Sequence, residues 1–186
     1  MAMGLSKRVT FEEYWQLPET NTFLELIDGE VIASGAREPI HQEALIKIIS
    51  LISKLRGDGE ILPPPVVVYL DEYNALEPDI FWVSPEHRHI LTNTHIIGAP
   101  DLVVEILSPY TAKRDKTIKF GLYQRYGVKE LWYADPVAEY LEVWTLVEGA
   151  FKYIGAYGAG DTFNSPLLGQ AVDVTAIFPP AEPTQL

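Results

Sequence analysis

The sequence predicts a single α/β domain with a restriction-endonuclease-like plan: a mixed central sheet, flanked by helices and extended by β-hairpins. Two observations carry this prediction. Short apolar strand segments alternate with two helical segments, over about 39–55 and 112–126. A strand–helix–strand unit also runs from DLVVEIL (101–107) through the second helix to ELWYAD (130–135), and such crossovers join parallel strands. At 186 residues the chain fits one domain, with a core over about 23–136 and C-terminal strands and a tail over 137–186.

The composition is that of an ordinary globular protein, with 47% apolar residues and no cysteine. The lack of cysteine excludes disulfides and cysteine-based zinc or redox sites, and it favours a cytoplasmic protein. The first residues, MAMGLSKRVTFEEYW, lack the apolar core of a signal peptide. No apolar run approaches the ~18 residues of a membrane span. We therefore expect a soluble, cytoplasmic protein that does not bind membranes.

The charge distribution is uneven along the chain. The formal net charge is -12, which opposes casual binding to DNA because DNA is itself a polyanion. Residues 111–130 carry a net charge of +4, which leaves -16 for the rest of the chain. We call the six cations of this segment the basic island: Lys113, Arg114, Lys116, Lys119, Arg125 and Lys129. The island is either a solvated helix face or a surface that meets phosphates.

The N-terminal third predicts a short helix, a hairpin and a long helix. Thr10–Glu13 has the pattern of a capping box, and the helix it opens should end near Leu17-Pro18. Apolar residues alternate around Asp28-Gly29 in FLELIDGEVIAS, which is the clearest hairpin signal in the chain. After Glu38-Pro39, apolar residues at spacings of three and four predict a helix that Arg56–Gly59 ends: Leu45, Ile48, Ile49, Ile52 and Leu55.

The remainder predicts strands around one further helix. We expect a strand over 59–72 after a stiff triple-proline entry, a short strand over 77–83, a loop with a helical turn over 84–97, and a central strand over 101–107. In the second helix, Ile118, Leu122 and Tyr126 are spaced by four, and Gly127 should end it. Alternating strands follow over 130–157, and the Pro-rich tail beyond Asp161 should wrap the surface.

The segment GAPDLVVEILS holds two carboxylates that a strand presents on one face, Asp101 and Glu105. Four residues of strand separate their backbones by roughly 13 Å, so the two cannot bind one ion together. Glu105 lies in an apolar run, where a glutamate rarely stands without a partner. It therefore needs a carboxylate from a neighbouring strand. The candidate is Asp79, in the other Pro-Asp dipeptide of the chain, EPDIFWVS.

A cation should accompany this pair at the edge where a strand ends and the next helix begins. Lys119 lies early in the helix that follows the Glu105 strand, and its spacing from Lys116 and Tyr123 predicts that all three share a face. A lysine at this place can position an attacking water or stabilise developing charge.

These segments together resemble the PD-(D/E)XK restriction-endonuclease-like superfamily. Within it they resemble an endonuclease-like family that is abundant in cyanobacteria and was long described as a domain of unknown function. The resemblance runs in order through ELIDGEVIAS, EPDIFWVS, GAPDLVVEILSP and DKTIKFGLYQRYGVKELWYADP, over about 24–136. It implies that Asp79 is the PD aspartate and Glu105 the acidic residue of the (D/E)XK element. Leu107 stands where that element has its lysine, a role that would pass to Lys119.

The resemblance also implies a function. Asp79 and Glu105 would bind Mg²⁺ (or Mn²⁺), Glu25 would complete the catalytic group, and Glu30 and His41 would be further members. The reaction would be hydrolysis of DNA phosphodiester bonds, with Lys113, Arg114 and Lys116 meeting the DNA backbone. A homodimer through the late Tyr/Trp-rich hairpins would fit the exposed edge that we expect there. Leu107 and the charge of -12 favour the alternative, a catalytically inactive restriction-fold module for DNA binding or protein assembly.

Each candidate also has a purely structural interpretation. Asp79 could be a strand-edge residue, Glu105 could form a buried ion pair with Lys119 without metal, and Lys119 could pair with Asp115 four residues before it. Glu25 could belong to a solvated face. We interpret Asp101 as a cap or turn residue, and His87, His89 and His95 as loop residues rather than zinc ligands, because no third ligand accompanies them at a suitable spacing.

Overall fold

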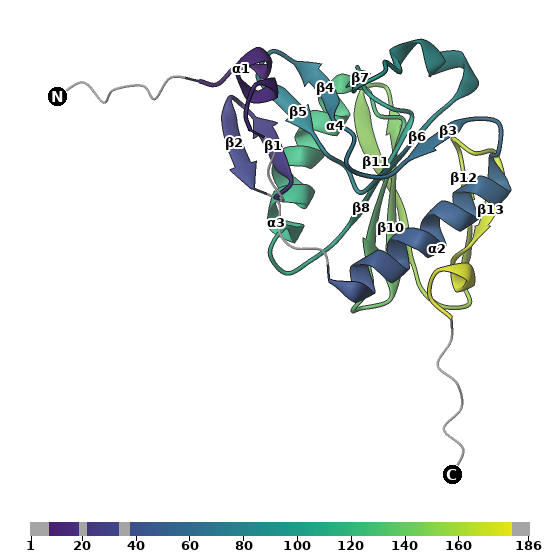
Figure 1. Cartoon of the computed structure of the whole chain (residues 1–186). Coiled ribbons are helices and arrows are strands. Elements are labelled where there is room, and N and C mark those ends of the chain that lie inside the picture. Colours follow the sequence, from purple (N-terminus) through teal and green to yellow (C-terminus); the bar gives the residue numbers. More distant parts are fainter. Residues whose placement is uncertain (1–7, 19–21, 34–37, 180–186) are drawn as a thin grey trace.

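A six-stranded mixed sheet forms the centre of the computed structural model, which describes residues 8–18, 22–33 and 38–179 (Figure 1). Its strand order is β11-β10-β9-β8-β6-β3. The strands are β3 (Glu60–Leu62), β6 (Ile80–Val83), β8 (Leu102–Ile106), β9 (Glu130–Asp135), β10 (Tyr140–Val147) and β11 (Ala150–Tyr157). β8 and β9 pair in parallel and the other neighbours pair antiparallel, so the predicted parallel crossover is confirmed.

A second sheet of five strands has the order β2-β1-β5-β4-β7. Its strands are β1 (Leu24–Ile27), β2 (Glu30–Ala33), β4 (Val68–Asp71), β5 (Asn74–Leu76) and β7 (Ile96–Ile97). The β1–β2 hairpin turns at Asp28 and Gly29, whose φ angles of 49° and 81° are those of the tight turn that the sequence predicts. A third, two-stranded sheet consists of β12 (Thr162–Ser165) and β13 (Gln170–Asp173).

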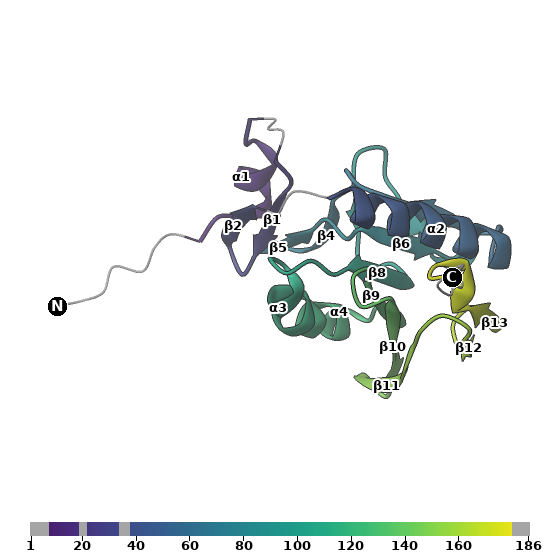
Figure 2. The same cartoon turned by 90° about the horizontal axis from the view of Figure 1, so that it is seen from below.

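The helices begin and end near the predicted signals. They are α1 (Phe11–Trp15), α2 (Pro39–Leu55), α3 (Ala112–Arg114) and α4 (Phe120–Tyr126), with 3-10 turns η1 (Pro85–Ile90) and η3 (Val174–Ala176) and a π-helical segment η2 (Asp115–Lys119). Thr10 and Glu13 form the capping box of α1. Gly127 ends α4 in the left-handed conformation, at φ 88°. Figure 2 shows α2 on one face of the central sheet and α3 and α4 on the other.

Alternation along β8 decides which layer each side chain enters. Leu102, Val104 and Ile106 belong to the core cluster that includes the apolar face of α2. Val103 and Leu107 belong to the cluster that includes α4 and the second sheet. Glu105 has the same parity as Val103 and Leu107, so its side chain enters the layer of α4, as the sequence predicts.

The predicted strand over residues 59–72 is wrong in one respect. The segment forms two strands in different sheets, β3 before the triple proline and β4 after it. A proline has no N–H to donate to a strand ladder, so Pro63, Pro64 and Pro65 end one strand and let the chain cross to the other sheet.

The prediction that the tail beyond Asp161 wraps the surface is also wrong. β12 and β13 form a hairpin, and this hairpin and η3 bury Phe163, Val172 and Val174 in the cluster under α2. The hairpin also covers Glu130, which accepts hydrogen bonds from Ser165 Oγ at 2.7 Å and Leu167 N at 3.1 Å. The core therefore extends well beyond residue 136.

Two further features concern the surroundings of the molecule. β11 is an edge strand of the central sheet, and its Tyr153 is 55% exposed. The homodimer through this region stays a prediction. No helix within the described ranges is both long enough and apolar enough to span a bilayer.

Candidate functional site

Glu105 lies near the end of β8, and the helix that follows this strand supplies its hydrogen-bond donors. The side chain is 3% exposed. Its Oε1 lies 2.5 Å from Lys119 Nζ and also accepts a hydrogen bond from the hydroxyl of Tyr123. Lys119 and Tyr123 are one helical turn apart, which brings both side chains to the same carboxylate.

Lys119 binds two further carboxylates. Its Nζ lies 2.9 Å from Glu25 Oε1 and 3.6 Å from Asp115 Oδ1. Glu25 comes from β1 of the other sheet, is fully buried, and its Oε2 lies 3.2 Å from Arg114 Nη2. The interpretation of Glu25 as a solvated-face residue is therefore wrong. The pairing of Lys119 with Asp115 is present, but it is one of three.

The π-helical segment η2 determines which side chains of the basic island point into this site. The N–H of Phe120 donates to the carbonyl of Asp115, and that carbonyl also accepts from the hydroxyl of Tyr133 at 2.7 Å. Such wide turns in a helix are frequent at functional sites. The extra residue per turn rotates Lys116 away from Lys119.

Two predictions about this helix are consequently wrong. Lys116 does not share the face of Lys119 and Tyr123, because its Nζ lies 2.5 Å from Glu142 Oε2 on β10. Ile118, which the spacing of four groups with Leu122 and Tyr126, is 46% exposed. The spacing of four assumed a regular α-helix, and the π turn shifts the residues within it relative to Leu122.

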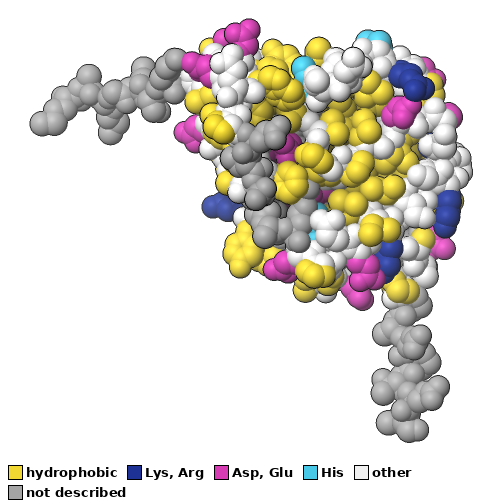
Figure 3. All heavy atoms as spheres, in the orientation of Figure 1, with side chains coloured by type: hydrophobic (Ala, Val, Ile, Leu, Met, Phe, Trp, Pro, Cys, Tyr) yellow, Lys and Arg dark blue, Asp and Glu magenta, His cyan; other side chains and the backbone are white. Residues whose placement is uncertain are grey.

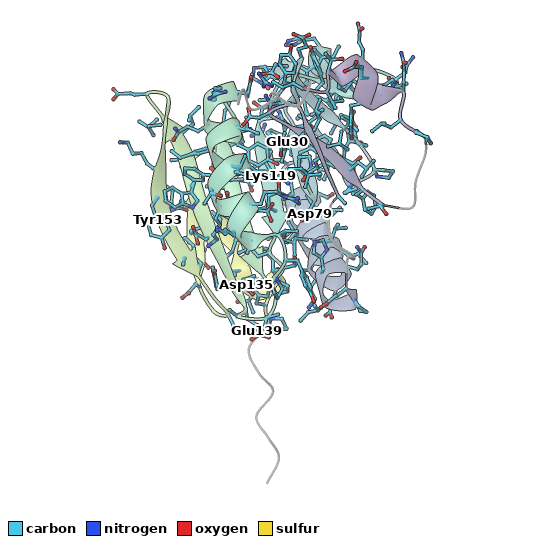
Figure 4. All side chains as sticks on the ribbon, turned by 90° about the vertical axis from the view of Figure 1, so that its left-hand side faces the viewer. Glu30, Asp79, Lys119, Asp135, Glu139 and Tyr153 are labelled. Carbon is cyan, nitrogen blue, oxygen red and sulfur yellow. The ribbon has the colours of Figure 1, made fainter. Side chains whose placement is uncertain are left out.

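Asp79 lies directly before β6 and close to the end of β8. It is 7% exposed, and its Oδ2 accepts a hydrogen bond of 2.8 Å from the N–H of Ile106, the residue after Glu105. The same oxygen lies 3.2 Å from Nε2 of His41, in the first turn of α2. The other ring nitrogen of His41, Nδ1, is buried without a hydrogen-bond partner. Figure 4 shows Asp79 and Lys119 between α2 and α4, with Tyr153 on the other side of α4 and Asp135 and Glu139 below α4 in the view.

The electrostatic balance of the site is acidic. Three carboxylates surround the ammonium of Lys119, those of Glu25, Glu105 and Asp115, and Glu25 also pairs with Arg114. A fourth acid, Asp79, is near enough to Glu105 to act on its charge. Burial raises the pKa of Glu105 to about 8, with Lys119 opposing the rise and the other three acids adding to it. Burial by itself would lower the pKa of Lys119, but its carboxylates raise that pKa well above the ordinary value. The lysine therefore stays charged while the acids compete for one ammonium.

The acidic side chains of the site decide what kind of metal ion they could hold. Within the described part of the chain, no three His, Asp or Glu side chains converge closely enough to hold a metal ion. Mg²⁺ is commonly held by only one or two carboxylates, with water and substrate phosphate oxygens as its other ligands. Asp79 and Glu105 can provide two carboxylates, and the excess of buried negative charge would be offset by a divalent cation.

The other sequence candidates lie apart from this cluster. Glu30 is exposed on β2, although it belongs to the hairpin that carries Glu25. Leu107, at the position of the motif lysine, is 7% exposed and packs in the core. His89 makes a ring contact with His87, and His95 packs against the rings of α1.

Asp101 is at the opposite end of β8 from Glu105. Its Oδ2 accepts from the N–H of Ser84 at 2.8 Å, and its Oδ1 lies 2.7 Å from both His87 Nδ1 and Lys129 Nζ. The cap-like bond to Ser84 agrees with our interpretation, and the ion pair with Lys129 and the contact with His87 are features that we did not predict.

Sequence reasoning missed the roles of Tyr123 and Arg114. Tyr123 was recognised only as a neighbour of Lys119, and its spacing of four from Lys119 was the available signal. Arg114 was assigned to the DNA backbone, but it pairs with Glu25. That pairing depends on how closely β1 approaches α3, and the local sequence carries no signal for such an approach.

Most cations of the basic island form ion pairs with acidic side chains of the protein itself. Arg114 pairs with Glu25, Lys116 with Glu142, Lys119 with the site carboxylates, and Lys129 with Asp101. Lys113 is exposed. The island therefore offers a phosphate backbone much less charge than its sequence suggests.

A mixed sheet with two acidic residues at the ends of adjacent strands, and a lysine beside them, is the arrangement of restriction-endonuclease-like proteins. Residues 11–175 match the family described as "Putative restriction endonuclease" (Uma2), so the chain belongs to that family. A crystal structure described as a putative nuclease of DUF820, from Anabaena variabilis ATCC 29413, has a TM-score of 0.75 with 19% identity, and the match covers 91% of this chain and 97% of that one. It shares the fold.

A relative in sequence is the uncharacterized protein sll1609 of Synechocystis sp. (strain ATCC 27184 / PCC 6803 / Kazusa). It is 27% identical over 128 residues, which are 67% of this chain and 72% of that protein. The family and the fold that the sequence predicts are thus confirmed.

Proposed function

We propose that the protein is a metal-dependent endonuclease that hydrolyses DNA phosphodiester bonds at the Asp79–Glu105 site. The observation that carries the proposal is the buried excess of carboxylates around Lys119, at the end of β8. Burying acidic groups in excess of their counter-charges is costly, so a fold retains them where a function needs them. The family description is consistent with this activity.

Asp79 and Glu105 would hold Mg²⁺ or Mn²⁺. Bound there, the ion would supply an acidified water and charge stabilisation for the phosphate oxygens. The N–H of Ile106 and Nε2 of His41 hold one oxygen of Asp79 in place. Tyr123 and Lys119 hold Oε1 of Glu105 in the same way.

Lys119 would act as the positioning cation for the attacking water. Its ammonium has three donors, of which two meet Glu105 at 2.5 Å and Glu25 at 2.9 Å. Asp115 is 3.6 Å away, so the third donor would serve the water. Arg114 balances the second oxygen of Glu25, which keeps Glu25 from drawing Lys119 away from Glu105. The motif lysine missing at Leu107 would be replaced in this way by a lysine from the helix.

The test is cleavage of supercoiled plasmid DNA with Mg²⁺ or Mn²⁺, comparing wild type with Glu105→Gln. Glu139→Gln is the matched control, because Glu139 is exposed and lies away from the site (Figure 4). We expect metal-dependent nicking by wild type and the control, and a loss of at least about a hundredfold for Glu105→Gln. Equal nicking by all three proteins, or nicking that survives chelation of the metal, would contradict the proposal.

One observation favours the alternative, a catalytically inactive module for DNA binding or protein assembly. Oε1 of Glu105 is already bonded to both Lys119 and Tyr123, so this part of the cluster can be stable as an ion pair without metal. Calorimetric titration with Mn²⁺ separates the two functions. Saturable binding that Glu105→Gln removes supports the nuclease, and no binding supports the module.

A further inference from the structure

We propose that Tyr110 is a stacking platform for an unpaired nucleobase beside the site, so that the preferred substrate is DNA with a single-stranded or frayed segment. This inference rests on the proposed function for the reaction, but it concerns how the substrate is chosen. It is carried by the position of Tyr110, the hydrogen bonds of its loop, and the charge that surrounds it.

Tyr110 lies in the loop that joins the two halves of the site. It is five residues after Glu105 and four before Arg114. Its side chain is 84% exposed, the largest value among the exposed large hydrophobic residues of the described chain. A tyrosine that stands out into solvent gains no burial from the fold, so its ring remains free to pack on a ligand.

The loop around Tyr110 is held by its own hydrogen bonds. Ser108 Oγ and Thr111 Oγ1 are 3.0 Å apart, and the N–H groups of Thr111 and Ala112 donate to the carbonyl of Ser108 at 3.2 and 3.0 Å. A turn held in this way fixes the backbone position from which the Tyr110 side chain extends. Much of the entropy cost of ordering a binding residue is then already met by folding.

Charge gives a further reason for a stacking contact. Nucleic-acid binding usually draws on lysine and arginine contacts to phosphates. Here four of the six cations of the basic island are held by the protein's own carboxylates, and the net charge is -12. Figure 3 shows lysine and arginine side chains scattered rather than gathered on the face it presents. Stacking of a base on an aromatic ring adds binding free energy without needing a cationic partner.

The same contact selects the form of the DNA. In a continuous duplex both faces of a base are covered by its neighbours, so an exposed ring can stack only on a base that is unpaired or displaced. Lys113, three residues after Tyr110 and exposed, can meet the phosphate next to such a base. The site would therefore meet the phosphodiester at a junction between paired and unpaired DNA.

The experiment measures binding separately from cleavage. A hairpin duplex with a short overhang that carries 2-aminopurine is titrated with protein in the presence of a chelator, alongside the same duplex fully paired. For wild type we expect a fluorescence change on the overhang and about tenfold tighter binding than to the paired duplex. Tyr110→Ala should lose both effects, and Tyr110→Trp and Tyr110→Phe should retain them.

Tyr153→Ala is the matched control, since Tyr153 is also an exposed tyrosine but lies on β11, away from the site (Figure 4). Thermal melting checks that each variant is folded. The inference is overturned if wild type shows no preference for the overhang, or if Tyr110→Ala binds it as tightly as wild type does. Nicking that persists in that case leaves the nuclease proposal standing. Tyr110-dependent binding without any nicking by wild type overturns the nuclease proposal alone.

Discussion

The two Pro-Asp dipeptides of the chain occupy equivalent places in one pair of antiparallel strands. Asp79 lies directly before β6 and accepts the N–H of Ile106 at the end of β8, whereas Asp101 lies directly before β8 and accepts the N–H of Ser84 just past the end of β6. Each aspartate is buried and has a histidine beside it, His41 for Asp79 and His87 for Asp101.

The difference lies in the charges around each end. Burial by itself would raise the pKa of Asp101, but Lys129 and Ser84 outweigh it and hold that pKa below the ordinary value. At the other end, Asp79 adds its charge to that of Glu105, whose pKa burial raises to about 8. The same dipeptide in the same backbone setting thus belongs to a satisfied ion cluster at one end and to an acidic site at the other. The surrounding charges, rather than the dipeptide, distinguish the two ends.

The largest expected effect is on the rate of DNA cleavage, which should depend on Asp79 but not on Asp101. Asp79→Asn should lower the rate of metal-dependent DNA cleavage by at least about a hundredfold, because it removes a charged metal ligand. Asp101→Asn should leave the cleavage rate per folded molecule unchanged and lower the free energy of unfolding by about 2 kcal/mol, because it weakens a buried charged cluster. Plasmid nicking and urea unfolding on the same preparations measure both. Equal loss of activity in the two variants would remove the distinction.

The next effect is on the free energy of unfolding, which should depend more on Lys119 than on Lys129. Lys119 is 3% exposed and compensates three carboxylates, so Lys119→Met should lower the free energy of unfolding by about 3–5 kcal/mol. Lys129 is 47% exposed, and solvent screens its pairing with Asp101, so Lys129→Met should cost only about 1 kcal/mol. Urea unfolding near pH 8 measures both. Similar costs for the two substitutions would show that Glu105 and Glu25 do not depend on Lys119 for their charge balance.

A third effect concerns how the free energy of unfolding depends on pH, because Glu105 and Asp101, at the two ends of β8, contribute in opposite senses. The folded protein holds the proton of Glu105 up to about pH 8, whereas the unfolded chain releases it near pH 4.5. Glu105 therefore makes the free energy of unfolding fall as the pH rises through this window, because the folded protein binds more protons there than the unfolded chain does. Asp101 acts in the opposite sense: its contribution is present above pH 3.8 and is lost as the pH falls through its lowered folded pKa.

Urea unfolding at a series of pH values tests this. Glu105→Gln should reduce the fall in the free energy of unfolding between pH 4.5 and 8. Asp101→Asn should reduce the loss of this free energy at acid pH, below about 3.8. The decline should be reduced rather than abolished in Glu105→Gln, because burial also raises the pKa of Asp115 and of Glu130. An unchanged slope in Glu105→Gln would show that this carboxyl is ionised throughout the range.

The comparison also shows which parts of the molecule the sequence could predict. The distance along a strand separates Asp101 from Glu105, and this local rule is enough to lead to Asp79 as the neighbour. The π turn at 115–119 is beyond such rules, because it is supported by a tertiary hydrogen bond from Tyr133. The pairing of Arg114 with Glu25 joins segments from two sheets and has no local signature. The C-terminal hairpin was missed because its strands are short and end in a Pro-rich segment, although it completes the core.

The smallest expected effect separates the two histidines. Nε2 of His41 lies 3.2 Å from Oδ2 of Asp79, which we propose as a metal ligand. His41→Asn removes the nitrogen that reaches this carboxylate, so it should weaken Mn²⁺ binding by about tenfold. His41→Gln can place its amide nitrogen near the position of Nε2 and should bind Mn²⁺ almost as wild type does. The same two substitutions at His87 should leave Mn²⁺ binding unchanged, because His87 pairs with Asp101 at the far end of β8. Calorimetric titration measures all four variants. If His41→Gln weakens binding as much as His41→Asn does, the imidazole acts through its packing, and the hydrogen bond to Asp79 does not position the ligand.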